Sequence, residues 1–178
     1  MSRGEGVMSE TKGDFVRVCL ADHGSHLLRY ARRLTGDPER AQDAVQETFL
    51  ALWRADHEGL RPRILPWLLA VCRNKALDRN KKERPMVALQ EGSAPSVEVS
   101  PQDGALARER EWRVRTALDA LPERQQEVVV LKFQNGLSYR EIAEVTGLSV
   151  SNVGFQLHVA LKTLRERLAE DKTAGGAA

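Results

Sequence analysis

Cys19, His23 and His26 come closest to a chemical centre in this sequence. Their spacing of four and then three residues would place a thiol and two imidazoles on one face of a helix. These groups are good zinc ligands, but a structural zinc site is closed by four ligands and no fourth is evident. Gly24 is in addition a candidate end for that helix. We therefore expect no metal and no cofactor.

No other arrangement of reactive side chains suggests catalysis. The sequence has no Ser/His/Asp set, no glycine-rich phosphate loop and no paired carboxylates at a plausible cleft, and none of its four histidines lies in a catalytic motif. Its two cysteines, Cys19 and Cys72, lie in apolar helical patterns, which indicates buried packing groups and not a disulfide. We expect a protein that is not an enzyme and has no small-molecule substrate.

The clearest pattern is electrostatic. Residues 37–58 include six acidic side chains and two basic ones, whereas residues 61–84 include eight basic and two acidic ones. The net charge of the whole chain is only +2, so this separation is the informative quantity. Solvated helix faces also separate charge without any function, so the pattern alone leaves both interpretations open.

The elements that position these charges are predicted to be helices. The chain has 178 residues, 42% hydrophobic and 29% charged, which is typical of a folded protein with one ordinary domain or two small ones. Apolar residues recur at helical spacing nearly throughout, and no alternating run is long enough for a sheet. The longest apolar stretches are too short to cross a bilayer, and no apolar signal region is visible. We expect an all-α protein of the cytoplasm.

Turn and cap residues divide the first half into helices. Gly36 ends one helix, and Asp37 followed by Pro38 provides an N-cap and the first residue of the next. A third helix is predicted to begin near Pro66 and to continue through the basic run. The second helix is expected to bury one stripe of residues, namely Ala41, Ala44, Val45, Thr48, Phe49 and Leu52.

Residues 85–104 separate the two halves. They include five prolines and glycines, no lysine or arginine, and no sustained apolar periodicity, which is typical of a flexible linker. The predicted organisation is a mobile N-terminus (1–13), a first helical domain (14–84), the linker (85–104), a second helical domain (105–170) and a mobile tail (171–178).

The second half contains the pattern of a helix-turn-helix. Ser138 and Glu141 have the spacing of a capping box at the start of a short helix, and Gly147 lies in the turn after it. Ser149 can then cap a last helix that continues to about Leu168.

Several segments resemble one known family. The string DPERAQDAVQETFLALWR (37–54) resembles the polymerase-binding helix of sigma region two, and PWLLAVCRNKALDRNKKER (66–84) resembles its promoter-melting helix. The strings ALDALPERQQEVVVLKF (117–133) and LSYREIAEVTGLSVSNV (137–153) resemble sigma region four. The chain is thus similar to the extracytoplasmic-function group of sigma factors. The resemblance implies two helical domains that bind core RNA polymerase and direct it to promoter DNA, with an anti-sigma factor as a possible further partner.

The resemblance assigns the exposed side of the second helix to polymerase. In the family, the positions that match Asp43, Gln46 and Glu47 contact the coiled-coil clamp of the largest polymerase subunit, and acidic and amide groups suit a basic partner helix. Without the resemblance, an ordinary solvated helix face would be the better interpretation. The full set expected to bind polymerase is Asp43, Gln46, Glu47, Leu50 and Trp53.

The basic run is assigned by the resemblance to the minus-ten element of the promoter. Opening a duplex costs stacking energy, so the protein has to neutralise phosphates and hold unpaired bases. Trp67 can be a stacking platform or part of the core, and its apolar neighbours favour the core. The residues expected at this element are Arg61, Arg63, Arg73, Asn74, Lys75, Arg79, Lys81 and Lys82.

The last helix departs from the family pattern. Family recognition helices are rich in arginine and lysine, whereas no formal charge lies between residues 149 and 161 here. The four usual basic positions hold Gly154, Gln156, Val159 and Leu161. Fewer phosphate contacts predict weak direct binding to the minus-thirty-five element. Helical projection predicts a core side of Val153, Leu157, Ala160, Leu164 and Leu168.

Three interpretations of the outer face of that helix stay open, namely base reading, docking of a protein, and no function. Two alternatives to a promoter-directing factor also stay open: an operator-binding helix-turn-helix regulator, and a sigma-like regulatory protein that has lost promoter binding. The residues expected at the minus-thirty-five element are Tyr139, Arg140, Ser149, Ser151, Asn152, Phe155, Gln156 and Lys162. The second domain is also expected to bind the flap of the second-largest polymerase subunit.

Overall fold

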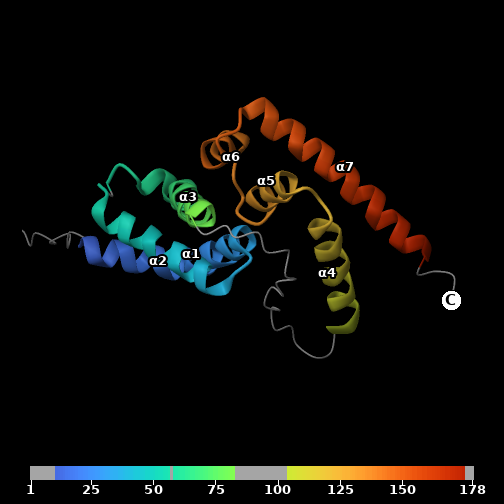
Figure 1. Ribbon diagram of the computed structural model, residues 1–178, viewed down its shortest axis with the longest axis horizontal. Coiled ribbons are helices and arrows are strands. Elements are labelled where there is room, and N and C mark those ends of the chain that lie inside the picture. The colour runs from blue at the N-terminus through green and yellow to red at the C-terminus, as the bar shows by residue number, and fades with distance from the viewer. Residues whose placement is uncertain (1–10, 57, 83–103, 175–178) are drawn as a thin grey trace, which may run out of the picture. The chain divides into compact units, whose positions relative to one another are not determined.

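Every regular element that the structure describes is a helix (Figure 1). The computed structural model describes residues 11–56, 58–82 and 104–174. The chain divides into two compact units, Met1–Ala94 and Pro95–Ala178. The prediction of an all-α protein with two small helical domains is confirmed, whereas the predicted linker, apart from Gly104, lies outside the described residues. Across the described ranges, no helix has the length and apolar character needed to cross a membrane.

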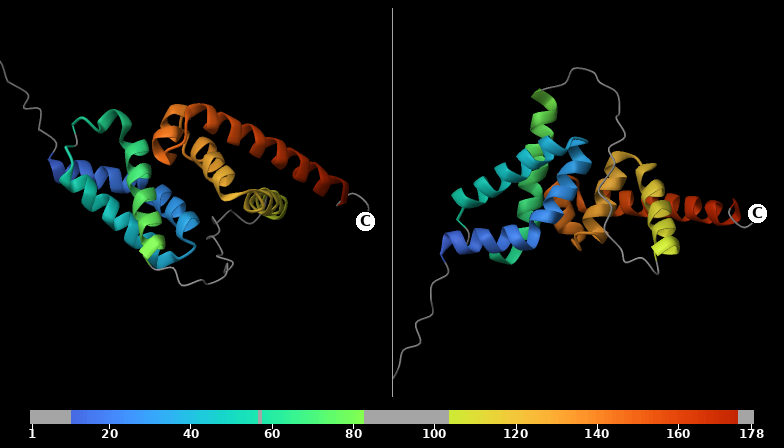
Figure 2. Two further views of the ribbon diagram at one scale, coloured as in Figure 1. Left: turned by 45° about the horizontal axis from the view of Figure 1, so that its top comes forward. Right: turned by 90° about the horizontal axis from the view of Figure 1, so that it is seen from below.

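The first unit is a bundle of three helices, α1 (Lys12–Thr35), α2 (Pro38–Arg54) and α3 (Ile64–Lys82), with one 3-10 turn (Arg61–Arg63) before α3. Each helix packs against the other two, and Figure 2 shows α3 running across the pair formed by α1 and α2. The core of the bundle is apolar and consists of Phe15, Cys19, Leu27, Tyr30, Ala31, Ala41, Ala44, Leu52, Leu68, Leu69, Cys72 and Ala76.

Helix α1 continues through Gly24, so the suggestion that this glycine ends the helix is wrong. Phe15 and Cys19 before it and Leu27 after it are all buried in the bundle. A glycine inside a helix costs about 1 kcal/mol relative to alanine, and burying a single large apolar side chain outweighs that cost. Packing on both sides of Gly24 therefore maintains one helix.

The candidate zinc ligands on α1 do not form a metal site. No group of three or more His, Cys, Asp or Glu side chains among the described residues could hold a metal ion. Cys19 and Cys72 are both buried free thiols. Burial raises the pKa of Cys72 to about 11, against a smaller opposing effect of the Thr48 hydroxyl, so this thiol stays protonated at neutral pH.

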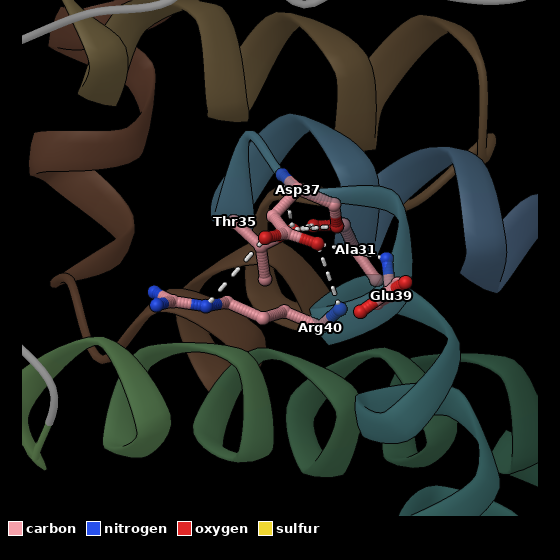
Figure 3. Close-up of polar contacts among 5 residues, drawn as sticks. All are labelled: Ala31, Thr35, Asp37, Glu39 and Arg40. Atoms are coloured by element: carbon pink, nitrogen blue, oxygen red, sulfur yellow. Dashed lines mark hydrogen bonds and ion pairs between the residues drawn. The ribbon is translucent and has the colours of Figure 1, made fainter.

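A tight turn joins α1 to α2 (Figure 3). Gly36 has a φ of 66°, in the left-handed region where glycine has no steric penalty, and it ends α1. The Asp37 carboxylate accepts hydrogen bonds from the backbone N–H groups of Glu39 and Arg40, at 2.8 and 3.1 Å. The Thr35 hydroxyl accepts from the Asp37 N–H at 3.2 Å. The predicted helix end and the predicted N-cap are both confirmed.

Two positions on α2 are less buried than predicted. Val45 and Phe49 are half-buried, whereas Ala44 and Thr48 are completely buried. The small side chains allow α1 and α3 to approach α2 closely, so the larger ones lie at the edges of the contact.

Helix α3 begins at Ile64, two residues before the predicted start at Pro66. Proline is tolerated in the first turn of a helix, because its missing N–H would have no partner within the helix there. Trp67, whose apolar neighbours favour a core position, is half-buried.

The second unit contains α4 (Gly104–Asp119), α5 (Glu123–Phe133), α6 (Tyr139–Thr146) and α7 (Val150–Ala174), and α7 packs against the other three. Helices α6 and α7 form the predicted helix-turn-helix. Gly147 ends α6 with a φ of 74°, and the Ser149 hydroxyl accepts from the Asn152 N–H at 3.2 Å at the start of α7. The buried core comprises Ala117, Leu118, Leu121, Val128, Val129, Val130, Leu131, Leu137, Ile142, Val145, Val153, Leu157 and Ala160.

Replacing Asp37 by alanine should destabilise the first unit by about 1 kcal/mol, because the backbone N–H groups at the start of α2 lose their acceptor. Asp37→Asn keeps an acceptor oxygen and should retain most of the stability. Urea denaturation in a Trp112→Phe background, followed by the fluorescence of Trp53 and Trp67, measures this in the full chain. Equal destabilisation by both substitutions would contradict the capping role.

Candidate functional site

One face of α2 brings together all five residues expected to contact polymerase. Leu50 and Trp53 are 55% and 51% exposed, Gln46 is exposed, and Asp43 and Glu47 are half-buried. Their spacing places them along one side of the helix, while the other side is completely buried in the bundle. These five side chains form a continuous surface, called the α2 face below.

The indole of Trp53 lies at the first turn of α1. A Cβ added at Gly13 would stand 3.9 Å from Trp53 Cζ3, an ordinary van der Waals contact. One edge of the ring therefore lies close to α1, while half of the residue's surface is open. An aromatic side chain that is anchored in this way can bind a partner with little loss of conformational freedom.

An ion pair connects the α2 face to α3. The Lys75 ammonium lies 3.2 Å from the Glu47 carboxylate, and the two side chains are 41% and 36% exposed. Glu47 is expected to bind polymerase, whereas Lys75 is expected to bind promoter DNA. At this exposure the pair contributes about 0–1 kcal/mol, so a charged partner of either residue can displace it. The two candidate surfaces are therefore neighbours that share a contact.

The residues expected at the minus-ten element lie on the 3-10 turn and on α3. Arg61 and Arg63 are exposed, and the Arg61 guanidinium lies 4.7 Å from the centroid of the Phe15 ring. On α3, Asn74 is exposed and Arg73 is half-buried. Helix α3 extends to Lys82, but the side chains of Arg79, Lys81 and Lys82 lie outside the described part of the chain.

The start of α7 presents polar and aromatic side chains. Phe155 is 63% exposed, Ser151 is exposed, and Asn152 and Gln156 are half-buried. The Gln156 amide donates to the Asn152 side-chain oxygen at 3.3 Å. The hydroxyl oxygens of Ser149 and Ser151 are 3.1 Å apart. Ser151 and Phe155 thus lie on the side of α7 opposite the predicted core residues.

The core side of α7 follows the prediction only in its first half. Val153, Leu157 and Ala160 are buried as expected, but Leu164 and Leu168 are half-buried. Helix α7 has 25 residues, whereas α5 and α6 have 11 and 8, so its later turns extend past these shorter partners. Lys162 is exposed, with its ammonium 4.0 Å from the Glu166 carboxylate.

Tyr139 lies against α7, a contact that sequence analysis missed. A Cβ added at Gly154 would stand 3.6 Å from Tyr139 Cε2. The Lys132 ammonium lies 5.6 Å from the centroid of the same ring and donates to the Leu137 carbonyl at 3.1 Å. Arg140, next to Tyr139, is exposed. The signal in the sequence that could have indicated this contact is Gly154, which stands where family recognition helices usually have a basic residue.

A capping box fixes the start of α6, where Tyr139 and Arg140 lie. The Glu141 carboxylate accepts from the Ser138 N–H at 2.7 Å, and the Ser138 hydroxyl accepts from the Glu141 N–H at 3.3 Å. The pKa of Glu141 is lowered from its usual value, first by the hydrogen bond with the Ser138 side chain and then by that with its backbone.

Comparison with known proteins covers both units. Residues 19–85 match the family described as Sigma-70 region 2, and residues 111–164 match Sigma-70, region 4. The ECF RNA polymerase sigma factor SigL of Mycobacterium tuberculosis is 32% identical over 160 residues, which cover 87% of this chain and 89% of the relative. The ECF RNA polymerase sigma factor EcfG of Rhodopseudomonas palustris is 32% identical over 146 residues, covering 82% and 80%.

The fold is also similar to a solved structure. CnrH, in complex with the cytosolic domain of CnrY, aligns with a TM-score of 0.59 and 28% identity, and the alignment covers 90% of this chain and 91% of CnrH.

The lowered pKa of Glu141 predicts a pH effect on the start of α6. Its ionised carboxylate stabilises α6 fully above the usual glutamate pKa, and this contribution is lost as the pH falls through the lowered value of the folded state. A side-chain NMR titration should show Glu141 protonating below the usual range, and Ser138→Ala should shift its pKa back upward. An unchanged pKa in the Ser138→Ala chain would contradict this account.

Proposed function

Because this chain belongs to the ECF RNA polymerase sigma factors of the sigma-70 family, which direct transcription initiation, we propose that two neighbouring surfaces of its first unit bind polymerase and promoter. The α2 face binds the clamp of the largest polymerase subunit. Helix α3 and the turn before it bind and open the minus-ten element. Family membership and the match to both regions weigh against a regulator that acts without polymerase.

The exposure of Leu50 and Trp53 is the observation that carries the polymerase assignment. Burying a large apolar side chain gains about 1.5–3 kcal/mol, yet both of these residues are more than half exposed in the bundle. They lie one turn apart, with Gln46 and Glu47 beside them. An apolar centre with a polar and acidic border is the usual composition of a protein interface, here suited to a basic partner helix.

The minus-ten assignment rests on charge and position. Arg61 and Arg63 are exposed residues of the 3-10 turn, and Asn74 is an exposed residue of α3. Guanidinium groups neutralise phosphates, and an amide can hydrogen-bond an unpaired base. Lys75 is released for DNA when a basic clamp residue takes its place beside Glu47.

The second unit binds DNA more weakly than the family pattern implies. The exposed start of α7 carries no formal charge, and Arg140 on α6 and Lys162 later on α7 are exposed cations. We assign residues 105–170 to the minus-thirty-five element and to the polymerase flap, and residues 14–84 to the clamp and the minus-ten element. Promoter selection then depends chiefly on the first unit.

The chain acts together with polymerase and performs no chemistry of its own, since RNA synthesis belongs to polymerase. This places it in the cytoplasm. CnrH binds another protein, the cytosolic domain of CnrY. By analogy, we expect an anti-sigma factor as a further partner of this chain.

Replacing both Gln46 and Glu47 by alanine should weaken binding to purified core polymerase at least about thirtyfold, the factor for a loss of about 2 kcal/mol at an interface centre. Fluorescence anisotropy of the labelled full chain measures this. The matched control replaces Asp22 and Ser25, an acidic and a polar residue that are exposed on α1. Equal effects of the two double substitutions, or no effect of the first, would contradict the assignment.

Gln156→Arg restores one of the missing family charges on α7. Holoenzyme with this variant should bind promoter DNA with a log–log salt slope steeper by about one unit, because one more phosphate contact releases about one more counterion. Gln134→Arg adds the same charge at the end of α5, where Gln134 is exposed, and should leave the slope nearly unchanged. An unchanged slope for Gln156→Arg would place α7 away from the DNA backbone.

A further inference from the structure

The exposed face at the start of α7 is built around one aromatic side chain. Phe155 is 63% exposed, with Ser151 one turn before it. Asn152 and Gln156 flank it on the adjoining side, and their amides hydrogen-bond each other at 3.3 Å. Because Val153 and Leu157 are buried, α7 cannot rotate to hide Phe155 without exposing its core side.

Tyr139 gives this face a fixed border. Its ring lies beside Gly154, where an added Cβ would be 3.6 Å from Cε2, so it occupies the side of α7 next to Phe155. The ring is 44% exposed and lies under the Lys132 ammonium. The capping box of Ser138 and Glu141 fixes the backbone that carries it.

The arrangement of charge around this face fits a DNA groove. Its centre is uncharged, while Arg140 on α6 and Lys162 on α7 are exposed at its borders. Cations at the border match two phosphate backbones, and an uncharged centre matches the floor of the major groove between them. In that groove, apolar side chains contact the thymine methyl group, and asparagine or glutamine amides pair with adenine.

We propose that the start of α7 reads the upstream promoter element mainly through thymine methyl groups against Phe155 and through adenine against the amides of Asn152 and Gln156. The proposal rests on the function proposed above and names the specificity of this site. Phe155 is the specificity-determining residue, and recognition of A·T pairs replaces the charge-based contacts that family recognition helices use. The upstream element of this factor is therefore rich in A·T pairs, and methyl groups contribute directly to its recognition.

The test removes single methyl groups from the DNA. Holoenzyme assembled from the full chain and purified core polymerase first selects promoters from a duplex library randomised upstream of the minus-ten element. Each thymine of the selected element is then replaced by deoxyuridine, which pairs identically but lacks the methyl group. At one or two positions the affinity should fall about fourfold, the factor that burying one methyl group provides.

Phe155→Ala holoenzyme should bind thymine and deoxyuridine promoters equally. Because Phe155 is exposed, this substitution leaves the core intact. Phe133→Ala removes a phenylalanine of similar exposure, 62%, from α5 and should retain the discrimination.

Three results would overturn the inference: no methyl dependence at any upstream position, no upstream preference in the selected promoters, or discrimination that survives Phe155→Ala. The second is the result expected if Phe155 docks a protein. If the holoenzyme used in these binding measurements still makes promoter-specific RNA in a transcription assay, only this inference fails and the proposed function stands. If no holoenzyme forms, both fail.

Discussion

The close packing of small side chains on α2 against α1 and α3 is the contact on which the first unit depends. Ala41, Ala44 and Thr48 are completely buried, and the Thr48 hydroxyl donates to the Ala44 carbonyl at 2.7 Å, so this buried hydroxyl has a hydrogen-bond partner. Any rotation of α2 about its axis would replace these side chains by larger ones and separate the helices. The α2 face is thus fixed by what the opposite side buries.

The two proposed surfaces of the first unit differ in charge but share one contact. The α2 face is acidic and apolar, the surface around Arg61 and Asn74 is basic and polar, and the Glu47–Lys75 pair lies where they meet. On the proposed assignment, a basic polymerase residue that binds Glu47 breaks this ion pair, so Lys75 no longer has to leave Glu47 when it binds DNA. The converse holds for DNA binding to Lys75, so polymerase binding and promoter binding would be weakly coupled.

The sequence predicts the features that depend on local chemistry. Gly36, Asp37 and the Ser138–Glu141 capping box act through neighbours within a few residues, and all three are confirmed. Features that depend on the packing of separate helices could not be predicted. The contact between Lys75 and Glu47, and that between Tyr139 and Gly154, join helices whose relative rotation no local pattern encodes. The continuation of α1 through Gly24 also depends on packing between helices, because residues on both sides of this glycine are buried in the bundle.

The central claim is that this chain, through its first unit, converts core polymerase into a promoter-specific enzyme. Run-off transcription with purified core polymerase and the full chain, on fragments of the genome that encodes it, tests this most directly. We predict transcripts that start at discrete sites, require both proteins and persist when the upstream element is altered but not when the minus-ten element is. Binding to core polymerase without specific RNA, or no binding at all, would contradict the account.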